Sequence, residues 1–242
     1  MLRLLATCFA ALAFATSLHA QSRPDRTEAL SLFDSARQRP VPVIMYRTVE
    51  KKAGKAKLAI ISHGYGGKYT DYSFIATTLV RLGYVVASIQ HEVPGDEPIA
   101  TTGNLRKTRR PNWERGVASI RFVAQTLRRT DPTIDGHQLL LVGHSNGGDM
   151  SMLFAATYPA EVANVISLDN RRMPLPRTKR PRLLSIRSID QVADPDVLPT
   201  PTEQHTFGIT VVQLPVLHND MWDGATDQQK RAMTDAITRF LQ

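Results

Sequence analysis

The chain has 242 residues, of which 42% are hydrophobic and 21% are charged, and its formal net charge is +8 at pH 7. This length and composition allow one ordinary globular domain with a sizeable core. The basic balance is compatible with anionic surfaces or substrates, but no basic stripe is interleaved with aromatic residues as in proteins that bind single-stranded nucleic acid. We therefore interpret the positive charge as a solvated exterior and expect no nucleic-acid partner.

Residues 1–20 have the pattern of a secretory signal peptide. Arg3 supplies a positive start, an apolar stretch runs from residue 4 to residue 18, and Ala20 is the small residue that a signal peptidase needs. The residue at the third position before that cut is large, so cleavage after Ser17 is the alternative. The apolar stretch is shorter than the run of about 18 apolar residues that a transmembrane helix needs. We expect export to the periplasm or the medium, with no stable membrane anchor after cleavage.

The remaining chain divides into residues 21–40, interpreted as an N-terminal segment that precedes the domain, and residues 41–242, interpreted as the folded domain. Removal of residues 1–20 takes away Cys8, the only cysteine. The mature chain then has no disulfide and no thiol nucleophile.

Apolar runs alternate with helix-period segments along the domain. Strands are predicted at residues 41–46, 58–62, 85–89, 139–142, 162–168, 183–187 and 209–214. Helices are predicted from an N-cap at Thr70 or Asp71 to a stop at Gly83, over residues 113–129, after residue 146, and from the capping box of Thr226 and Gln229 to residue 240. This alternation predicts an α/β fold with a mostly parallel central sheet flanked by helices. No long insertion suggests a large lid domain.

A glycine-rich turn follows the buried strand at residues 139–142. Gly143, Ser145 and Gly147 form a G-x-S-x-G pattern, and a helix-period run follows it. A serine on a sharp strand-to-helix turn needs small residues two positions before and after it, because a Cβ there would collide with the approaching backbone. This setting predicts a nucleophile elbow with Ser145 as the nucleophile.

A second glycine cluster, residues 63–67, follows the buried strand at residues 58–62, and a histidine, His218, lies between the last strand and the last helix. Two aspartates, Asp190 and Asp194, follow the strand at residues 183–187. A nucleophile, a base, an acid and a close-approaching glycine loop are the parts that acyl transfer requires.

These parts resemble the α/β-hydrolase superfamily, whose members carry their triad in the order Ser, Asp, His. The resemblance covers essentially the whole mature chain. It implies Ser145 as nucleophile, His218 as general base and Asp190 as the acid. It also implies an oxyanion hole formed by the backbone N–H groups of Tyr65 and Asn146.

The acid has alternatives. Asp190 is preferred because it comes directly off its strand, where the backbone is best held, and its Asp-x-x-Ala continuation matches many relatives. Asp194 lies four residues farther on and is the alternative acid. Asp169, which follows the preceding strand, is a third candidate, since a minority of lipase-like enzymes use that position.

Within the superfamily, three segments resemble the branch of dienelactone hydrolases and platelet-activating-factor acetylhydrolases: residues 37–43 with Tyr46, residues 62–67 and residues 83–86. Dienelactone hydrolases carry a cysteine nucleophile, whereas this chain has Ser145. The position of Tyr65 also resembles bacterial cutinase-like polyester hydrolases, although the mature chain lacks their common disulfide.

The resemblance implies an exported serine esterase that acts on small or short-acyl esters and requires no cofactor. His63, His144 and His218 show no metal-ligand spacing, so no metal site is expected, and His144 is interpreted as a packing residue. The alternatives are a peptidase or amidase with the same triad, and a non-catalytic binding protein of the same fold. Substrate identity and oligomeric state do not follow from the sequence.

Overall fold

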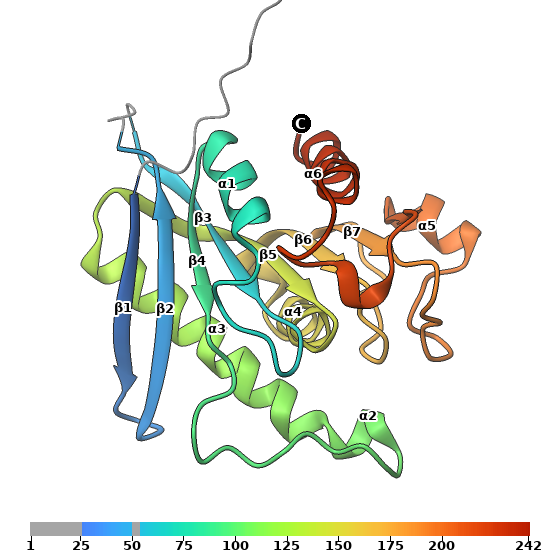
Figure 1. The fold of residues 1–242 in the computed structure, drawn as a ribbon, viewed down its shortest axis with the longest axis horizontal. Coiled ribbons are helices and arrows are strands. Elements are labelled where there is room, and N and C mark those ends of the chain that lie inside the picture. Colours follow the sequence, from blue (N-terminus) through green and yellow to red (C-terminus); the bar gives the residue numbers. More distant parts are fainter. Residues whose placement is uncertain (1–25, 50–53) are drawn as a thin grey trace, which may run out of the picture.

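An eight-stranded sheet runs through the described residues, 26–49 and 54–242, of the computed structural model (Figure 1). The strand order is β1-β2-β4-β3-β5-β6-β7-β8, and all pairs from β4 to β8 are parallel, whereas β1 with β2 and β2 with β4 are antiparallel. The strands are β1 (Arg26–Asp34), β2 (Arg39–Arg47), β3 (Ala56–Ser62), β4 (Tyr84–Ile89), β5 (Ile134–His144), β6 (Val162–Leu168), β7 (Arg182–Arg187) and β8 (Thr210–Gln213). The predicted α/β fold with a mostly parallel sheet is confirmed. The predicted signal peptide, residues 1–20, lies outside the described residues.

Helices cover both faces of this sheet, with α3 and α4 on one face and α1 and α6 on the other (Figure 1). The α-helices are α1 (Ser73–Arg81), α2 (Leu105–Thr108), α3 (Arg110–Thr130), α4 (Asn146–Thr157), α5 (Pro201–Phe207) and α6 (Asp227–Leu241), and short 3-10 helices span Pro159–Glu161 and His218–Asp220. Successive side chains of a strand point to opposite faces. On β3, Leu58 and Ile60 pack in the core under α3 and α4, whereas Ala59 and Ile61 pack in the core under α1 and α6. The uninterrupted apolar runs of the sequence therefore reflect strands buried on both sides.

Residues 26–40 differ from the sequence-based interpretation, because they belong to the sheet rather than preceding it. β1 pairs along its whole length with β2 and forms an antiparallel hairpin at the sheet edge. Its partly buried side chains, Leu30 and Leu32 among them, alternate with outward residues such as Phe33. An edge strand needs only this weak alternation, since one of its faces stays in contact with water.

The start of α1 also differs from the prediction. The N-cap is Tyr72, which makes no capping hydrogen bond with its side chain, instead of Thr70 or Asp71. The carboxylate of Asp223 accepts hydrogen bonds from the first-turn N–H groups of Ser73 and Phe74, at 3.0 and 3.1 Å. A residue from the far end of the chain thus satisfies helix donors that a local cap would otherwise satisfy.

None of the helices in the described residues combines the length and the apolarity that crossing a membrane requires.

Candidate active site

The turn after β5 holds Ser145 in a backbone conformation that few residues other than glycine adopt. Ser145 has φ 50° and ψ −114° and stands at the N-cap of α4. A Cβ at Gly143 would collide with the backbone of Gly147, and a Cβ at Gly147 would collide with the carbonyl group of Ser62 on β3. Both glycines are therefore required for the close approach of strand and helix that presents the Ser145 hydroxyl.

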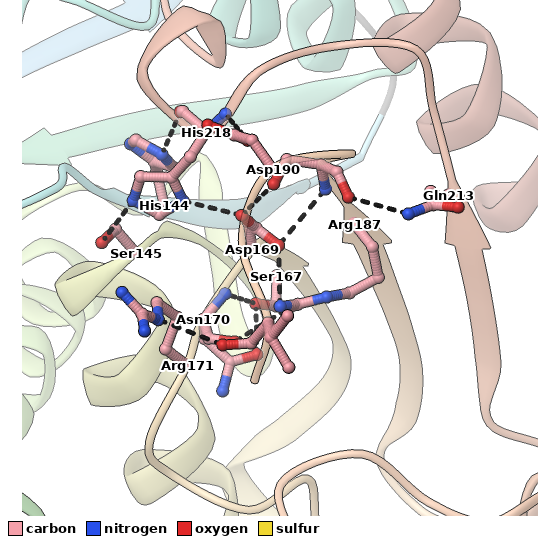
Figure 2. A network of polar contacts seen from close by, with 12 residues as sticks. His144, Ser145, Ser167, Asp169, Asn170, Arg171, Arg187, Asp190, Gln213 and His218 are labelled. Atoms are coloured by element: carbon pink, nitrogen blue, oxygen red, sulfur yellow. Dashed lines mark hydrogen bonds and ion pairs between the residues drawn. The ribbon is translucent and has the colours of Figure 1, made fainter. Parts of the chain in front are cut away.

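His218 brings its imidazole to this hydroxyl from the loop after β8 (Figure 2). Its Nε2 lies 3.1 Å from the Ser145 Oγ, and its Nδ1 lies 2.7 Å from the Oδ2 of Asp169. A carboxylate oxygen accepts, so Nδ1 carries the proton and Nε2 is left to accept from the serine hydroxyl. This is the geometry of a nucleophile and a general base whose tautomer is set by a carboxylate.

Asp169 is fully buried at the end of β6 and is surrounded by donors. Its carboxylate forms an ion pair with Arg187 at 2.7 Å and accepts hydrogen bonds from the hydroxyl and the N–H of Ser188, at 2.6 and 3.2 Å. Burial by itself would raise the pKa of Asp169, but the bond from His218, the charge of Arg187 and the bonds from Ser188 hold this pKa below its ordinary value. The group facing the imidazole is therefore an ionised carboxylate.

The two aspartates preferred from the sequence lie elsewhere. Asp190 is exposed, and its Oδ1 accepts the backbone N–H of His218 at 2.7 Å, so this hydrogen bond goes to the main chain and not to the ring. Asp194 lies farther along the same loop, and its own backbone N–H donates to the carbonyl of Arg171. The expectation that Asp190, or alternatively Asp194, faces the imidazole is corrected to Asp169. The only sequence feature that pointed to Asp169 was its position at the end of a strand, and Asp190 also follows a strand.

The glycine loop after β3 approaches the serine as expected. A Cβ on Gly64 would lie 3.5 Å from the Cβ of Ser145. The carbonyl of Gly64 accepts from the Nδ1 of His63 at 2.8 Å and from the N–H of Gly67 at 3.0 Å. Gly64 and Tyr65 share one peptide group, and in a trans peptide the N–H and the C=O point in opposite directions. The N–H of Tyr65 therefore points away from His63 and Gly67, the two donors to the Gly64 carbonyl.

The second expected oxyanion donor is the N–H of Asn146, in the first turn of α4, where helix N–H groups have no partner within the helix. The side chain of Asn146 forms its hydrogen bonds with α3 instead. Its Oδ1 accepts from the indole of Trp113 at 2.8 Å, and its Nδ2 donates to Asn112 at 2.9 Å. No sequence pattern pointed to these two supports on α3.

His144 connects the elbow to two other parts of the site. Its Nε2 donates to the carbonyl of His218 at 3.1 Å, and its Nδ1 accepts from the hydroxyl of Tyr72 at 2.8 Å. The same hydroxyl accepts the N–H of Gly64 at 3.1 Å. Burial lowers the pKa of His144 to about 3, so the ring is neutral. His144 thus packs as predicted, and it also links the base loop with the glycine loop through hydrogen bonds.

In the described part of the chain, no group of three or more histidine, cysteine, aspartate or glutamate side chains is arranged to hold a metal ion.

Comparisons with known proteins bear on the fold and on the class of protein. The family model described as serine aminopeptidase, S33, matches residues 54–168, which run from just before β3 to the end of β6 and include Ser145. No curated protein matches the sequence.

Among solved structures, the neighbours share the fold at low sequence identity. An α/β serine hydrolase without a lid from Xanthomonas campestris is 20% identical, with a TM-score of 0.56 over 90% of this chain and 96% of that one. A hyperthermophilic esterase from Pyrobaculum calidifontis is 14% identical, with a TM-score of 0.63 over 90% of this chain and 84% of that one. Esterase 2 from Thermogutta terrifontis, phosphorylated by paraoxon, is 14% identical, with a TM-score of 0.65 over 91% and 94% of the two chains. The chain thus has the α/β-hydrolase fold, and the family model and the structures that it matches are those of serine hydrolases and esterases.

Proposed function

We propose that the protein is a serine esterase that cleaves small or short-acyl carboxylic esters through an acyl-enzyme. One observation carries this proposal: the His218 imidazole lies between the Ser145 hydroxyl, at 3.1 Å, and the Asp169 carboxylate, at 2.7 Å. The serine hydrolases and esterases among the matches support the same class of reaction.

The reaction proceeds in two halves. His218 takes the proton of Ser145 as Oγ attacks the ester carbonyl, and the backbone N–H groups of Tyr65 and Asn146 stabilise the resulting oxyanion. The intermediate collapses and expels the alcohol, which takes the proton from His218. Water, deprotonated by His218, then attacks the acyl-enzyme, releases the acid and restores Ser145. Throughout, Asp169 holds the imidazole tautomer and stabilises the imidazolium.

The preference for small esters is based on the surroundings of Ser145. The segment between β4 and α3 contributes only the four-residue α2, and the segment between β7 and β8 contributes only the seven-residue α5, so neither forms a separate lid domain. Tyr65 and Leu217 are 45% and 44% exposed and supply apolar surface beside the oxyanion loop and directly before His218. Such surface suits the hydrocarbon part of a small ester.

The test is labelling by a fluorophosphonate probe together with hydrolysis of short 4-nitrophenyl esters. The wild type should label and turn over, and Ser145→Ala should abolish labelling and reduce kcat by about 10⁶-fold, with a similar loss in His218→Ala. Ser151→Ala is the matched control, because Ser151 is buried in α4 and donates to the carbonyl of Gly147. A folded wild type that neither labels nor hydrolyses any ester would favour a non-catalytic binding protein of this fold.

A peptidase is the second candidate, and the match to the serine aminopeptidase model supports it. The same triad attacks amides, although a poorer leaving group makes the acylation step more demanding. Aminoacyl 4-nitroanilides assayed beside the corresponding esters separate the two activities. A kcat/KM for the anilide equal to or above that for the ester would move the assignment to peptidase.

We also propose export, on the signal-peptide pattern of residues 1–20, and membership of the dienelactone hydrolase and platelet-activating-factor acetylhydrolase branch, on the resemblances of residues 62–67 and 83–86. N-terminal sequencing of the protein from the periplasm or the medium tests export. A mature chain that still begins at Met1 would contradict it.

A further inference from the structure

Four arginines come from two segments, α2 with the residue before α3, and the loop that begins two residues after Asp169. They are Arg106, Arg109, Arg171 and Arg172, called the arginine cluster below. Arg106 joins these two segments, because its Nε donates to the carbonyl of Arg172 at 3.1 Å. Burial, with the charges of Arg172 and Arg171, lowers the pKa of Arg109.

The cluster differs from neighbouring arginines in its lack of close ion pairs within the part of the chain that the structure describes. In the described residues, none of its four members forms an ion pair, whereas neighbouring Arg110 pairs with Glu114 at 2.8 Å. Backbone carbonyls orient the side chains instead: Arg109 donates to Ala100 at 2.8 Å and Arg171 donates to Val192 at 3.3 Å. The Nε of Arg172 is buried without a hydrogen-bond partner.

Two carboxylates lie close enough to raise the pKa of Arg109, those of Asp149 and Asp194. Asp149 is buried, and its Oδ1 is occupied by the N–H groups of Arg172 and Met173, at 3.0 and 2.8 Å. Asp196 lies beside Asp194 in the hollow that Arg106 lines, so four guanidinium groups stand against three carboxylates and an excess of positive charge remains. Held by carbonyls, the guanidinium groups keep free N–H donors for a further acceptor.

The cluster is connected to the nucleophile through α3 and β6. Trp113, one turn after Arg109, donates its indole N–H to the side chain of Asn146, the residue that follows Ser145. Arg171 comes two residues after Asp169, and Figure 2 shows its guanidinium extending toward the side of the site where Ser145 lies. Asp149 links the two directly, because its backbone N–H donates to the carbonyl of Ser145 at 3.0 Å and its Oδ1 accepts the N–H of Arg172 at 3.0 Å. The segment of Arg171 and Arg172 therefore lies beside the first turn of the helix that Ser145 caps.

We propose that the arginine cluster, through Arg109 and Arg171, binds a carboxylate at the distal end of the ester, so that the preferred substrates are half-esters of dicarboxylic acids. This inference rests on the proposed esterase function and names its substrate class. A guanidinium matches a carboxylate with two parallel N–H donors, and water exclusion beside a partly buried arginine strengthens the pair.

The experiment compares two substrates of nearly equal size, mono-4-nitrophenyl glutarate and its neutral methyl ester, in wild type, Arg109→Gln, Arg171→Gln and Arg171→Lys. The wild type should prefer the half-ester at least tenfold in kcat/KM at low salt, and the preference should shrink as salt is added. Each Gln variant should lower kcat/KM for the half-ester about tenfold more than for the neutral ester. Arg171→Lys should retain more of the preference, because it keeps the charge.

Arg110→Gln is the matched control, since Arg110 is the exposed neighbour of Arg109 and already pairs with Glu114. It should leave the ratio of the two substrates unchanged, and circular dichroism checks that each variant folds. Equal kcat/KM values for both substrates in wild type, or equal losses for both in the Gln variants, would overturn the cluster's role and leave the esterase intact.

Calorimetric titration of glutarate into Ser145→Ala gives a readout that needs no turnover. Glutarate should bind to this variant, and adding Arg171→Gln should weaken the binding about tenfold. If no ester is hydrolysed but glutarate binds in this way, the esterase proposal fails and the anion site stands. Absence of binding would count against the anion site itself.

Discussion

Two loops at the carboxyl edge of the sheet each place an aspartate 2.7 Å from an atom of His218, but the two aspartates contact different parts of that residue. Asp169, after β6, is buried and contacts Nδ1 of the ring at 2.7 Å. Asp190, after β7, is exposed and contacts the backbone N–H of the same residue at 2.7 Å. Only the ring changes its protonation state in the reaction, so a bond to the ring bears on catalysis and a bond to the backbone bears on position.

The order of strands in this sheet favours the difference. β6 is the direct neighbour of β5, and the N–H of Ser145 donates to the carbonyl of Leu168 at 2.8 Å. The next residue, Asp169, therefore starts beside the nucleophile. β7 lies one strand farther away, a step of about 4.8 Å. Asp190 is thus better placed to hold the incoming His218 loop than to reach its ring.

Replacement of the two aspartates by asparagine is the strongest test of this comparison. Asp169→Asn keeps the shape but offers an amide to Nδ1, which favours the wrong tautomer and fails to stabilise the imidazolium. We expect kcat to fall by about 10³- to 10⁴-fold, as for the buried aspartate of a serine protease triad. Asp190→Asn, assayed on the same 4-nitrophenyl ester, is the control and should lose less than tenfold. A reversed order would return the acid to Asp190.

Arg187 provides the second test, because its ion pair with Asp169 at 2.7 Å is also buried. Arg187→Met leaves the carboxylate without its cation, and we expect a loss of about 3 kcal/mol in the free energy of unfolding at pH 7. The folded-state pKa of Asp169 is depressed, so its contribution to stability is present above the unfolded value near 4 and is lost as the pH falls through the folded value.

Urea unfolding of wild type and Arg187→Met from pH 7 down to pH 3 therefore gives a signed expectation. The difference between the two proteins should be largest at pH 7 and should shrink as the pH falls and Asp169 takes up a proton. Arg182→Met is the control, because the exposed Arg182 interacts with Phe240 and with no carboxylate in the described chain. A difference that stays constant over this pH range would show that the ion pair is not its cause.

Much of the fold follows from hydrophobic periodicity and glycine placement. The strands from residue 58 onward and the elbow at Ser145 were predicted because buried parallel strands form continuous apolar runs that end at glycine turns. The edge strand β1 was missed because its alternation is weak and interrupted by charge. The cap of α1 was missed because its partner, Asp223, lies about 150 residues away along the chain.

The sequence pattern predicted the nucleophile and the base, but it did not decide which aspartate is the acid. Ser145 and His218 each have a distinct position in the order of elements, and the structure brings them together at 3.1 Å. Asp169 and Asp190 both follow a buried strand, so the sequence pattern does not separate them. The choice depends on which strand adjoins β5 and on where the His218 loop settles, and these are properties of the assembled sheet.

Asp190 itself supplies the smallest effect and the sharpest test of a positional role. Its exposed carboxylate accepts one backbone N–H, a task that an amide oxygen performs almost as well. We expect Asp190→Asn to lower kcat/KM about twofold and Asp190→Ala, which removes the acceptor, about five- to tenfold, because the His218 loop loses a hydrogen bond worth about 1 kcal/mol. The pH profile of kcat/KM should keep its shape in both variants, since neither substitution touches the ring. If Asp190→Asn were as damaging as Asp190→Ala, or if either shifted the pH profile, Asp190 would act through its charge on the imidazole and the division of labour between the two loops would be wrong.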